Sequence, residues 1–414
     1  MCRASPGSLR AAYCPRMTHA VVSDRARIVA IRAHALFDGV SATLIPEPVL
    51  LLDGPAIVGV GRATVPPGAQ VVDLPGATLL PGLIDTHVHL AFDASADPVA
   101  ALAMRDDDAT IAAMTSAART ALHAGITTVR DLGDRGYLSL RLRDTPGLPS
   151  IVAAGPPVTT PAGHCHFLGG AAEPTPGALR AAVRERADRG VDIVKVMASG
   201  GTMTPGTRQE VAQFTAEQLT VVVDEAHRLG LPVTAHAHGT AAIRTALDAG
   251  VDGMEHVSFW SAEGVDDPGD LIARIAAGRV AVGITAGVAP EPGVTPPPAV
   301  VARMPRIIAN TRAMYEAGAR MVIGTDAGIG LPKPHDVLRY ALAQTSMIGL
   351  DAPTALRLAT STAAEACGLG HHKGRLAPGY DADIVAVRGN PLHDLNALHD
   401  VRAVFARGAR VASS

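Results

Sequence analysis

Two histidines, His87 and His89, stand one residue apart in the segment LIDTHVHL at residues 83–90. Side chains two positions apart on a β-strand project from the same face, so the two imidazoles would point in the same direction. Neutral imidazole is a common ligand of zinc and similar divalent ions. The spacing predicts a two-histidine metal clip, and this motif alone leaves open the alternative of two structural histidines near a loop.

A lysine, Lys195, interrupts the apolar run VDIVKVMASGG at residues 191–201. The chain has 36 lysines and arginines together, and only three of them are lysine: Lys195, Lys333 and Lys373. Burial of an unpaired ammonium in an apolar strand costs on the order of several kcal/mol. We therefore expect Lys195 to have a chemical role. A neutral lysine, or one whose charged end reaches solvent, is the alternative.

Three further polar residues fall within or just after apolar runs: His236 in TAHAHG, His256 in MEHVS and Asp326 in GTDAG. Each alone has an ordinary explanation, because a single strand histidine is usually structural and an aspartate after a strand often caps a helix. With the runs that hold His87, His89 and Lys195, five apolar runs carry such a residue in their middle or last part. Coincidence does not easily explain all five. We predict that these residues meet at one site.

Short apolar segments alternate with helix-length amphipathic segments between residues 81 and 373, as in parallel strands joined by right-handed crossovers. A helix is expected over 215–229, with Thr215 as its N-cap and Gly230 after its end. Eight strand–helix units predict an α/β TIM barrel, whose active site lies at the carboxyl ends of the strands. The eight expected strands are residues 83–90, 127–133, 150–155, 192–198, 232–238, 253–258, 280–286 and 320–327.

The two ends of the chain differ from this central part. Residues 27–80 and 374–412 read as short β segments that glycine and proline interrupt about every 8–12 residues, which is typical of a small sandwich. We expect them to form one composite β-sandwich domain beside the barrel of residues 81–373. Residues 1–26 are expected to be a disordered extension.

Composition excludes several classes of function. The net charge of −3 and the 3% of aromatic residues argue against a nucleic-acid partner. No stretch approaches the ~20 apolar residues of a membrane span. The four cysteines, Cys2, Cys14, Cys165 and Cys367, are scattered and contain no CxxC motif, and the N-terminal segment is a poor secretory signal. A cytoplasmic protein that acts on a small molecule is expected.

Two longer motifs carry a family resemblance. PGLIDTHVHL at 81–90 and STAAEACGLGHHKGRLAPGYDADIVAV at 361–387 resemble the metal-dependent amidohydrolase superfamily, and the likeness extends over about residues 27–412. The resemblance implies two divalent metal ions, zinc in the first place. It also implies that CO2 carboxylates Lys195 to a carbamate that bridges the two ions. The implied metal ligands are His87, His89, Lys195, His236, His256 and Asp326.

This constellation predicts hydrolysis by a metal-activated water. Asp326 would accept the proton of the water and pass it to the leaving nitrogen. Within the superfamily, the chain is similar to the prolidase-like and imidazolonepropionase-like branch, through the segments TTPAGHCHFLGG at 159–170, VKVMASGG at 194–201 and TAHAHG at 234–239. The branch implies a substrate or oxyanion contact by His164, which we count with Asp326 as catalytic.

Four other residues are candidate substrate contacts. His166 could share the role of His164, and Arg208 could hold a substrate carboxylate. His238 stands where peptide-cleaving relatives often carry a tyrosine, which puts dipeptide specificity in doubt. His335 follows the eighth strand, where it either lines the mouth of the site or caps a helix.

The expected reaction is cleavage of an amide-type C–N bond in a small molecule, with a dipeptide or an N-acyl amino acid as the favoured substrate. A cyclic amide, as in imidazolonepropionase, or a urea or carbamate is the alternative. A catalytically inactive scaffold with the same fold is a different class, and the presence of every expected ligand argues against it. Lys195 argues against a one-metal deaminase. The resemblance also implies a homo-oligomer.

Overall fold

The computed structural model describes residues 28–62 and 64–411 of the chain. The extension expected at residues 1–26 lies outside the described residues. All eight strands expected in the central part are present, in the expected order. They are β6 (Leu83–Val88), β7 (Ile126–Asp131), β8 (Ser150–Ala153), β9 (Val194–Met197), β10 (Val233–Gly239), β11 (Gly253–Trp260), β12 (Ala281–Thr285) and β13 (Arg320–Gly324).

These strands form two parallel sheets, one in the order β6-β7-β8 and the other in the order β13-β12-β11-β10-β9. Within the described residues, a continuous closed barrel of paired strands is therefore not found. Backbone pairing between the facing sheet edges is limited, among the described residues, to isolated parallel bridges, Val88 with Ala327 and Val158 with Val196. Further hydrogen bonds cross these edges, such as those from Thr325 to Asp85 and from the N–H of Asp192 to the carbonyl of Ala153.

The two breaks have local causes. At the first, Asp326 has a left-handed backbone (φ 60°), which stops β13 from continuing as a regular strand beside β6. At the second, the chain leaves β8 through Gly155 (φ 66°) and two prolines, Pro156 and Pro157, which have no backbone N–H to donate to a ladder. Regular pairing is thus interrupted at both edges, at one of them by Asp326, which lines the cavity described below.

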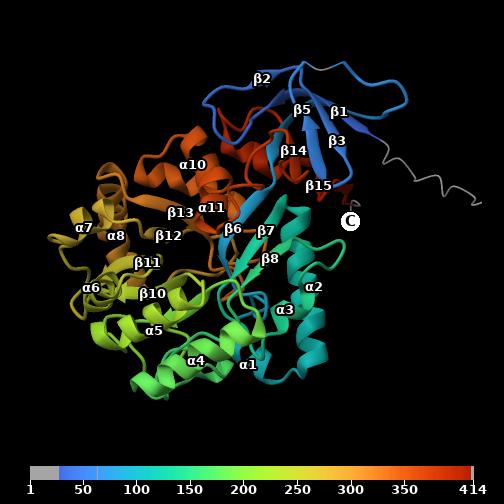
Figure 1. Cartoon of the computed structure of the whole chain (residues 1–414). Helices are drawn as coiled ribbons and strands as arrows, with labels where there is room; N and C mark the ends of the chain where they lie inside the picture. The colour runs from blue at the N-terminus through green and yellow to red at the C-terminus, as the bar shows by residue number, and fades with distance from the viewer. Residues whose placement is uncertain (1–27, 63, 412–414) are drawn as a thin grey trace, which may run out of the picture.

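Helices connect and surround the strands (Figure 1). The helix expected over 215–229 is α5 (Ala216–Arg228), and Thr215 and Gln218 form a capping box at its start. The other α-helices are α1 (Pro98–Ala103), α2 (Asp107–His123), α3 (Leu138–Leu142), α4 (Pro176–Arg189), α6 (Thr240–Ala249), α7 (Leu271–Ala277), α8 (Pro298–Glu316), α9 (Leu338–Gln344), α10 (Ala352–Leu358) and α11 (Ser361–Ala366). Short 3-10 turns are η1 (His166–Leu168), η2 (Thr345–Ile348) and η3 (Leu395–His399).

Both ends of the chain contribute to one further sheet, seen at the top of Figure 1. Its order is β16-β15-β14-β5-β1-β3-β4, with β2 paired to β1. The expected meeting of the two ends is therefore present, but a sandwich of two packed sheets is not confirmed. The strands are β1 (Val29–Leu36), β2 (Ile45–Pro46), β3 (Val49–Asp53), β4 (Ala56–Gly59), β5 (Gln70–Pro81), β14 (Ile384–Arg388), β15 (Val401–Ala406) and β16 (Ala409–Arg410).

Gly82 connects this terminal sheet to the central strands, because it is the single residue between β5 and β6. Its N–H donates to the carbonyl of Asp383, 2.8 Å away, and this hydrogen bond connects the β5–β6 junction to the C-terminal part of the chain. A Cβ at this position would lie 2.0 Å from Oγ1 of the buried Thr127. The close approach of the backbone to Thr127 therefore requires glycine.

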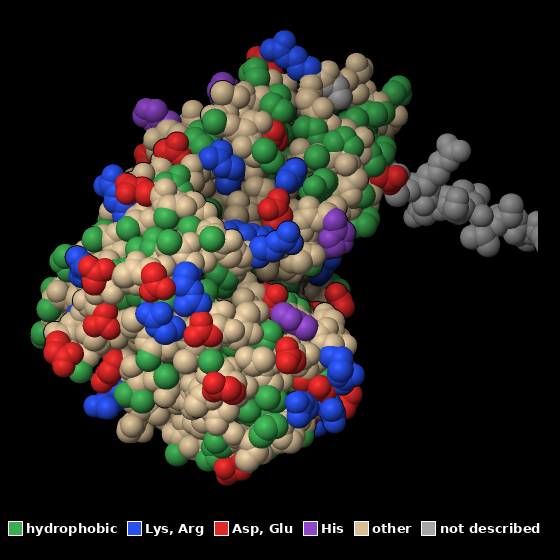
Figure 2. All heavy atoms as spheres, turned by 60° about the vertical axis from the view of Figure 1, so that its left-hand side comes forward, with side chains coloured by type: hydrophobic (Ala, Val, Ile, Leu, Met, Phe, Trp, Pro, Cys, Tyr) green, Lys and Arg blue, Asp and Glu red, His purple; other side chains and the backbone are tan. Residues whose placement is uncertain are grey.

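On the face of the molecule in Figure 2, Lys and Arg side chains are interspersed with Asp and Glu, and neither sign dominates a large area. Among the described residues, no helix combines the length and the apolar character that a membrane crossing requires. Cys165 and Cys367 are free thiols.

Substitution of Gly82 by alanine is expected to destabilise the protein by about 1–3 kcal/mol, because the new methyl group would overlap Thr127 in a packed region. Denaturant unfolding of the purified variant measures the change. Gly177→Ala is the matched control, because a Cβ there meets open space in α4. Equal stability of the Gly82→Ala protein and the control would contradict the requirement for glycine between β5 and β6.

Candidate active site

A cavity lies at the carboxyl ends of the central strands, where the sequence predicts the site. His87 at the end of β6 and His89 directly after it form one pair of histidines, His236 and His238 on β10 form a second, and Lys195 enters the cavity from β9. The described residues that line it are His87, His89, Phe92, His164, Cys165, Lys195, Met197, Thr202, Met203, Gln209, His236, His238, His256, Thr285, Asp326, Ile329 and Lys333.

One group of potential metal ligands consists of His87, His89 and Asp326, all buried. Nε2 of His89 lies 3.2 Å and Nε2 of His87 lies 3.5 Å from Oδ1 of Asp326. Burial by itself would raise the pKa of Asp326, but the two histidines outweigh it and hold this pKa well below its ordinary value. Asp326 is therefore ionised at neutral pH, as a metal-binding carboxylate must be.

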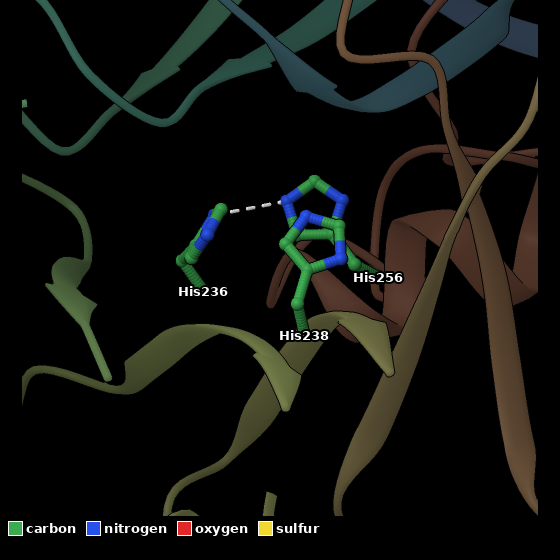
Figure 3. Close-up of side chains that lie close together, drawn as sticks. All are labelled: His236, His238 and His256. Carbon is green, nitrogen blue, oxygen red and sulfur yellow. Dashed lines mark hydrogen bonds between the residues drawn. The ribbon is translucent and has the colours of Figure 1, made fainter. Parts of the chain in front are cut away.

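A second group consists of His236, His238 and His256 (Figure 3). Nδ1 of His236 and Nε2 of His256 lie 3.0 Å apart, and the rings of His238 and His256 stack with centroids 4.1 Å apart. From sequence, His238 is expected only as a substrate contact, although the HAH spacing at 236–238 repeats the HVH spacing at 87–89. Its ring is close enough to the other two for a ligand role.

The backbone at the end of β11 is unusual, because His256, Val257 and Phe259 all have positive φ values of 75°, 45° and 52°. Such conformations cost roughly 1–3 kcal/mol each in non-glycine residues and cluster at functional sites. This bend turns the ring of His256 toward His236 instead of following the regular alternation of a strand.

Lys195 is fully enclosed, with 1% of its surface exposed. Its Nζ has no hydrogen-bond partner among the described residues. Burial lowers the pKa of Lys195 to about 8, against the opposing charges of Glu255 and Asp326. A buried ammonium without a hydrogen bond is an unstable arrangement, so an additional group at Nζ is expected.

The four strand histidines expected as ligands are each held through one ring nitrogen. Nδ1 of His89 donates to the carbonyl of Gly133 and Nε2 of His236 donates to that of Gly200. Nδ1 of His256 lies 2.9 Å from Oγ1 of Thr285, and Nδ1 of His87 lies 3.2 Å from Oε2 of Glu255 without the alignment of a hydrogen bond. The other nitrogen of each ring faces another candidate ligand, either Asp326 or a second histidine, as in metal sites whose histidines are oriented by outer contacts.

Five of the six histidines that line the cavity are also held in the neutral form: His87, His164, His236, His238 and His256. Burial lowers the pKa of His87 and of His164 to about 4 and that of His238 to about 3. Burial lowers the pKa of His236 and His256 well below the ordinary value as well. Neutral imidazoles are the form that binds metal, so this donor set fits two divalent ions.

The predicted substrate contacts lie in different surroundings. His164 lines the cavity, with its ring centroid 4.8 Å from that of His236 and its Nδ1 without a partner among the described residues. Gly201 makes room for it, since a Cβ there would lie 2.3 Å from Nε2 of His164. His238 also lines the cavity, and its Nδ1 lies 2.8 Å from Oγ of Ser258.

The other three candidates do not line the cavity. His166 is exposed and donates from Nδ1 to the carbonyl of Gly163. The side chain of Arg208 is 70% exposed and lies beside Glu210, with Nε 3.5 Å from Oε1. His335 is buried and donates from Nε2 to the carbonyl of His89, so it supports the loop after β6.

Comparison with known proteins places the chain in a family. Residues 78–411 match the Amidohydrolase family. The chain belongs to this family. It is 30% identical over 356 residues to ochratoxinase from Aspergillus niger, a match that covers 79% of this chain and 73% of that protein.

Two further matches cover most of the chain. Imidazolonepropionase from Mesorhizobium japonicum is 27% identical over 396 residues, with 85% of this chain and 89% of that protein covered. A crystal structure of a Xaa-Pro dipeptidase with methionine bound in its active site superimposes with a TM-score of 0.79 at 27% identity, over 92% of this chain and 99% of the other. The family implies hydrolase activity, and these relatives support action on C–N bonds.

A buried ion pair, which the sequence analysis missed, lies beneath the ligands. Oε1 of Glu255 accepts from Nη2 of Arg130 at 3.0 Å and from Oγ1 of Thr234 at 2.8 Å, while Oε2 approaches His87. Burial alone would raise the pKa of Glu255, but Arg130 and His87 hold it well below its ordinary value. Gly283 leaves the space for this carboxylate, because a Cβ there would lie 2.0 Å from Oε2.

Removal of the cation from this pair is expected to be costly. Arg130→Met leaves Glu255 buried without its partner, and the expected loss of stability is about 3–5 kcal/mol. The double variant Arg130→Met/Glu255→Gln removes the unpaired charge and should recover part of the loss. The stabilities are compared through the denaturant midpoints of unfolding of the two variants. A double variant no more stable than Arg130→Met would show that the unpaired charge of Glu255 is not the cause of the loss.

Proposed function

We propose that the protein is a binuclear metal-dependent hydrolase that cleaves an amide-type C–N bond in a dipeptide or an N-acyl amino acid. The observation that carries the proposal is the enclosure of the unpartnered Lys195 Nζ in a cavity with two groups of metal-ligand side chains. In this assignment His87, His89 and Asp326 hold one ion, and His236 and His256 hold the other.

Carboxylation of Lys195 would complete both groups. The reaction with CO2 needs the neutral amine, and a pKa of about 8 makes that form far more abundant at neutral pH than in an ordinary lysine. The product carries two oxygens and a negative charge, so it replaces the unpaired ammonium by a bridging ligand. Arginine could not substitute, because it does not form this carbamate.

Two bound divalent ions would polarise the scissile carbonyl and activate a water. The side chains of the cavity would supply the proton transfer and the contact with the substrate oxygen. Asp326, ionised and beside both histidines of β6, accepts the proton of the attacking water and delivers it to the leaving nitrogen. His164, neutral and without a partner at Nδ1 among the described residues, would donate a hydrogen bond to the substrate oxygen.

The substrate class rests on the lining and on the relatives. Phe92, Met197, Met203 and Ile329 line the cavity and suit an apolar side chain. The dipeptidase with bound methionine supports an amino acid product. Imidazolonepropionase supports a cyclic amide as the second candidate, and the urea or carbamate alternative of the sequence analysis stays with it.

Metal analysis and a substrate panel test the proposal together. Zinc-loaded protein is expected to hold two equivalents of metal per chain and to hydrolyse members of a panel of dipeptides, N-acyl amino acids, cyclic amides and ureas. Native mass measurement should show the mass of one CO2 added to the chain. Lys195→Ala should lose the added mass and most of the metal.

Less than one equivalent of metal in the wild-type protein, with no hydrolysis of any panel member, would favour the inactive scaffold. Two equivalents of metal beside an unmodified Lys195 would contradict the bridging role alone.

Asp326→Asn is expected to lower kcat by about 10²–10⁴-fold, the usual contribution of a positioned general acid–base. Much of the metal should remain, because the amide oxygen of asparagine can still act as a ligand and the other ligands are intact. Initial rates and metal content are measured on the same preparation. Wild-type turnover in Asp326→Asn would rule out the proton-transfer role.

A further inference from the structure

We infer that Lys333 binds the carboxylate of the substrate, which makes a free carboxylate a requirement for recognition. The inference rests on the proposed function and adds a specificity residue to it. Lys333 lies in the loop after β13 and lines the cavity together with Asp326, Ile329 and Thr285.

The ammonium of Lys333 is held at the edge of the cavity and keeps hydrogen-bonding capacity. Nζ donates to the carbonyl of Thr325 at 2.7 Å, and the carbonyl of Thr285 lies at 3.5 Å, the limit of a hydrogen bond. An ammonium has three donors. At least one of them is therefore available to a ligand in the cavity.

The loop around Lys333 is rigid enough to place this charge. Its N–H donates to the carbonyl of Gly330 at 2.9 Å, and its carbonyl accepts from the N–H of Gly328 at 2.8 Å. Pro332 and Pro334 flank it and restrict the backbone further. Such pre-organisation reduces the entropy lost when a ligand binds.

Lys333 is also the cation that remains for a substrate. Among the described residues that line the cavity, Lys195 and Lys333 are the lysines and no arginine is present. Lys195 is assigned to the ions, and Arg208, the carboxylate partner expected from sequence, lies in solvent. A carboxylate that enters the cavity thus finds in Lys333 an ammonium that forms no direct ion pair with a described carboxylate, although the charges of Asp326 and Asp85 act on it from a greater distance.

The position of Lys333 defines an orientation. Its Nζ lies at the ends of β12 and β13, beside Thr285, whose Oγ1 contacts His256. His164 follows β8, on the side of the cavity formed by β8 and β9. A substrate whose carbonyl oxygen meets His164 would therefore extend its carboxylate past His256 toward Lys333.

A purely structural role is the competing explanation, because Nζ also ties the carbonyls of two strand ends together. A substrate pair separates the two explanations. N-acetyl-L-leucine carries the carboxylate, and N-acetyl-L-leucinol has a hydroxymethyl group in its place and the same scissile amide. Acetate release is measured for both with zinc-loaded wild-type protein and Lys333→Met.

Lys333→Met is expected to lower kcat/KM for N-acetyl-L-leucine by about 10–100-fold, as for the loss of one charge-assisted hydrogen bond. The value for N-acetyl-L-leucinol should change by less than about threefold, and the wild-type preference for the acid should disappear. Equal losses on both substrates would overturn the inference. Arg306→Met is the matched control, because Arg306 is exposed on α8 and pairs with Asp267 outside the cavity.

Binding of the products gives a measurement that does not need turnover. Calorimetry with L-leucine and L-leucinol is expected to show tighter binding of L-leucine to the wild-type protein, and a loss of that difference in Lys333→Met. If no panel substrate is hydrolysed but this pattern holds, the proposed reaction fails and the carboxylate site stands. If L-leucine gains nothing over L-leucinol in the wild-type protein, the inference about Lys333 is wrong.

Discussion

The site depends on the enclosure of Lys195, whose amine the fold removes from water without giving it a hydrogen bond. An unpaired ammonium in this position would be costly, so Nζ requires a partner, and the proposed carboxylation of Lys195 would supply one. The charged residues around it are consistent with this requirement. Glu255 and Arg130 neutralise each other, and Asp326 is the remaining anion in contact with the histidines.

The histidines illustrate how a strand sequence becomes a binding geometry. Three of the four expected histidine ligands use one ring nitrogen in a hydrogen bond to a carbonyl or hydroxyl of the protein, and the fourth, His87, has one nitrogen beside the carboxylate of Glu255. These contacts come from loops and strands other than the ligand's own. The left-handed residues at the ends of β11 and β13 aim His256 and Asp326 where regular strands would not. Stability lost in this strained backbone is offset by the large apolar core outside the cavity.

Much of this arrangement was accessible from sequence. The apolar runs gave the eight central strands and Thr215 gave the start of α5, because both signals are local. The residues expected as ligands meet in one cavity, since parallel strands end on the same side. Loop residues were harder to place: nothing local distinguishes Lys333, which lines the cavity, from Arg208, which is exposed. Glu255 was overlooked because its partner Arg130 is distant in the chain, and the terminal strands formed one sheet because alternation does not specify how strands stack.

The contact between β6 and β13 has a consequence for synthesis of the chain. The N–H of Asp326 donates to the carbonyl of His87, and the N–H of His89 donates to the carbonyl of Ala327. These bonds join the first central strand to the last, so a growing chain carries His87 and His89 long before Asp326 emerges. Until then the two histidines face an open sheet edge. The metal binding proposed for the first group of ligands would therefore be coupled to completion of the fold, and a chain truncated before β13 would carry the two histidines without Asp326.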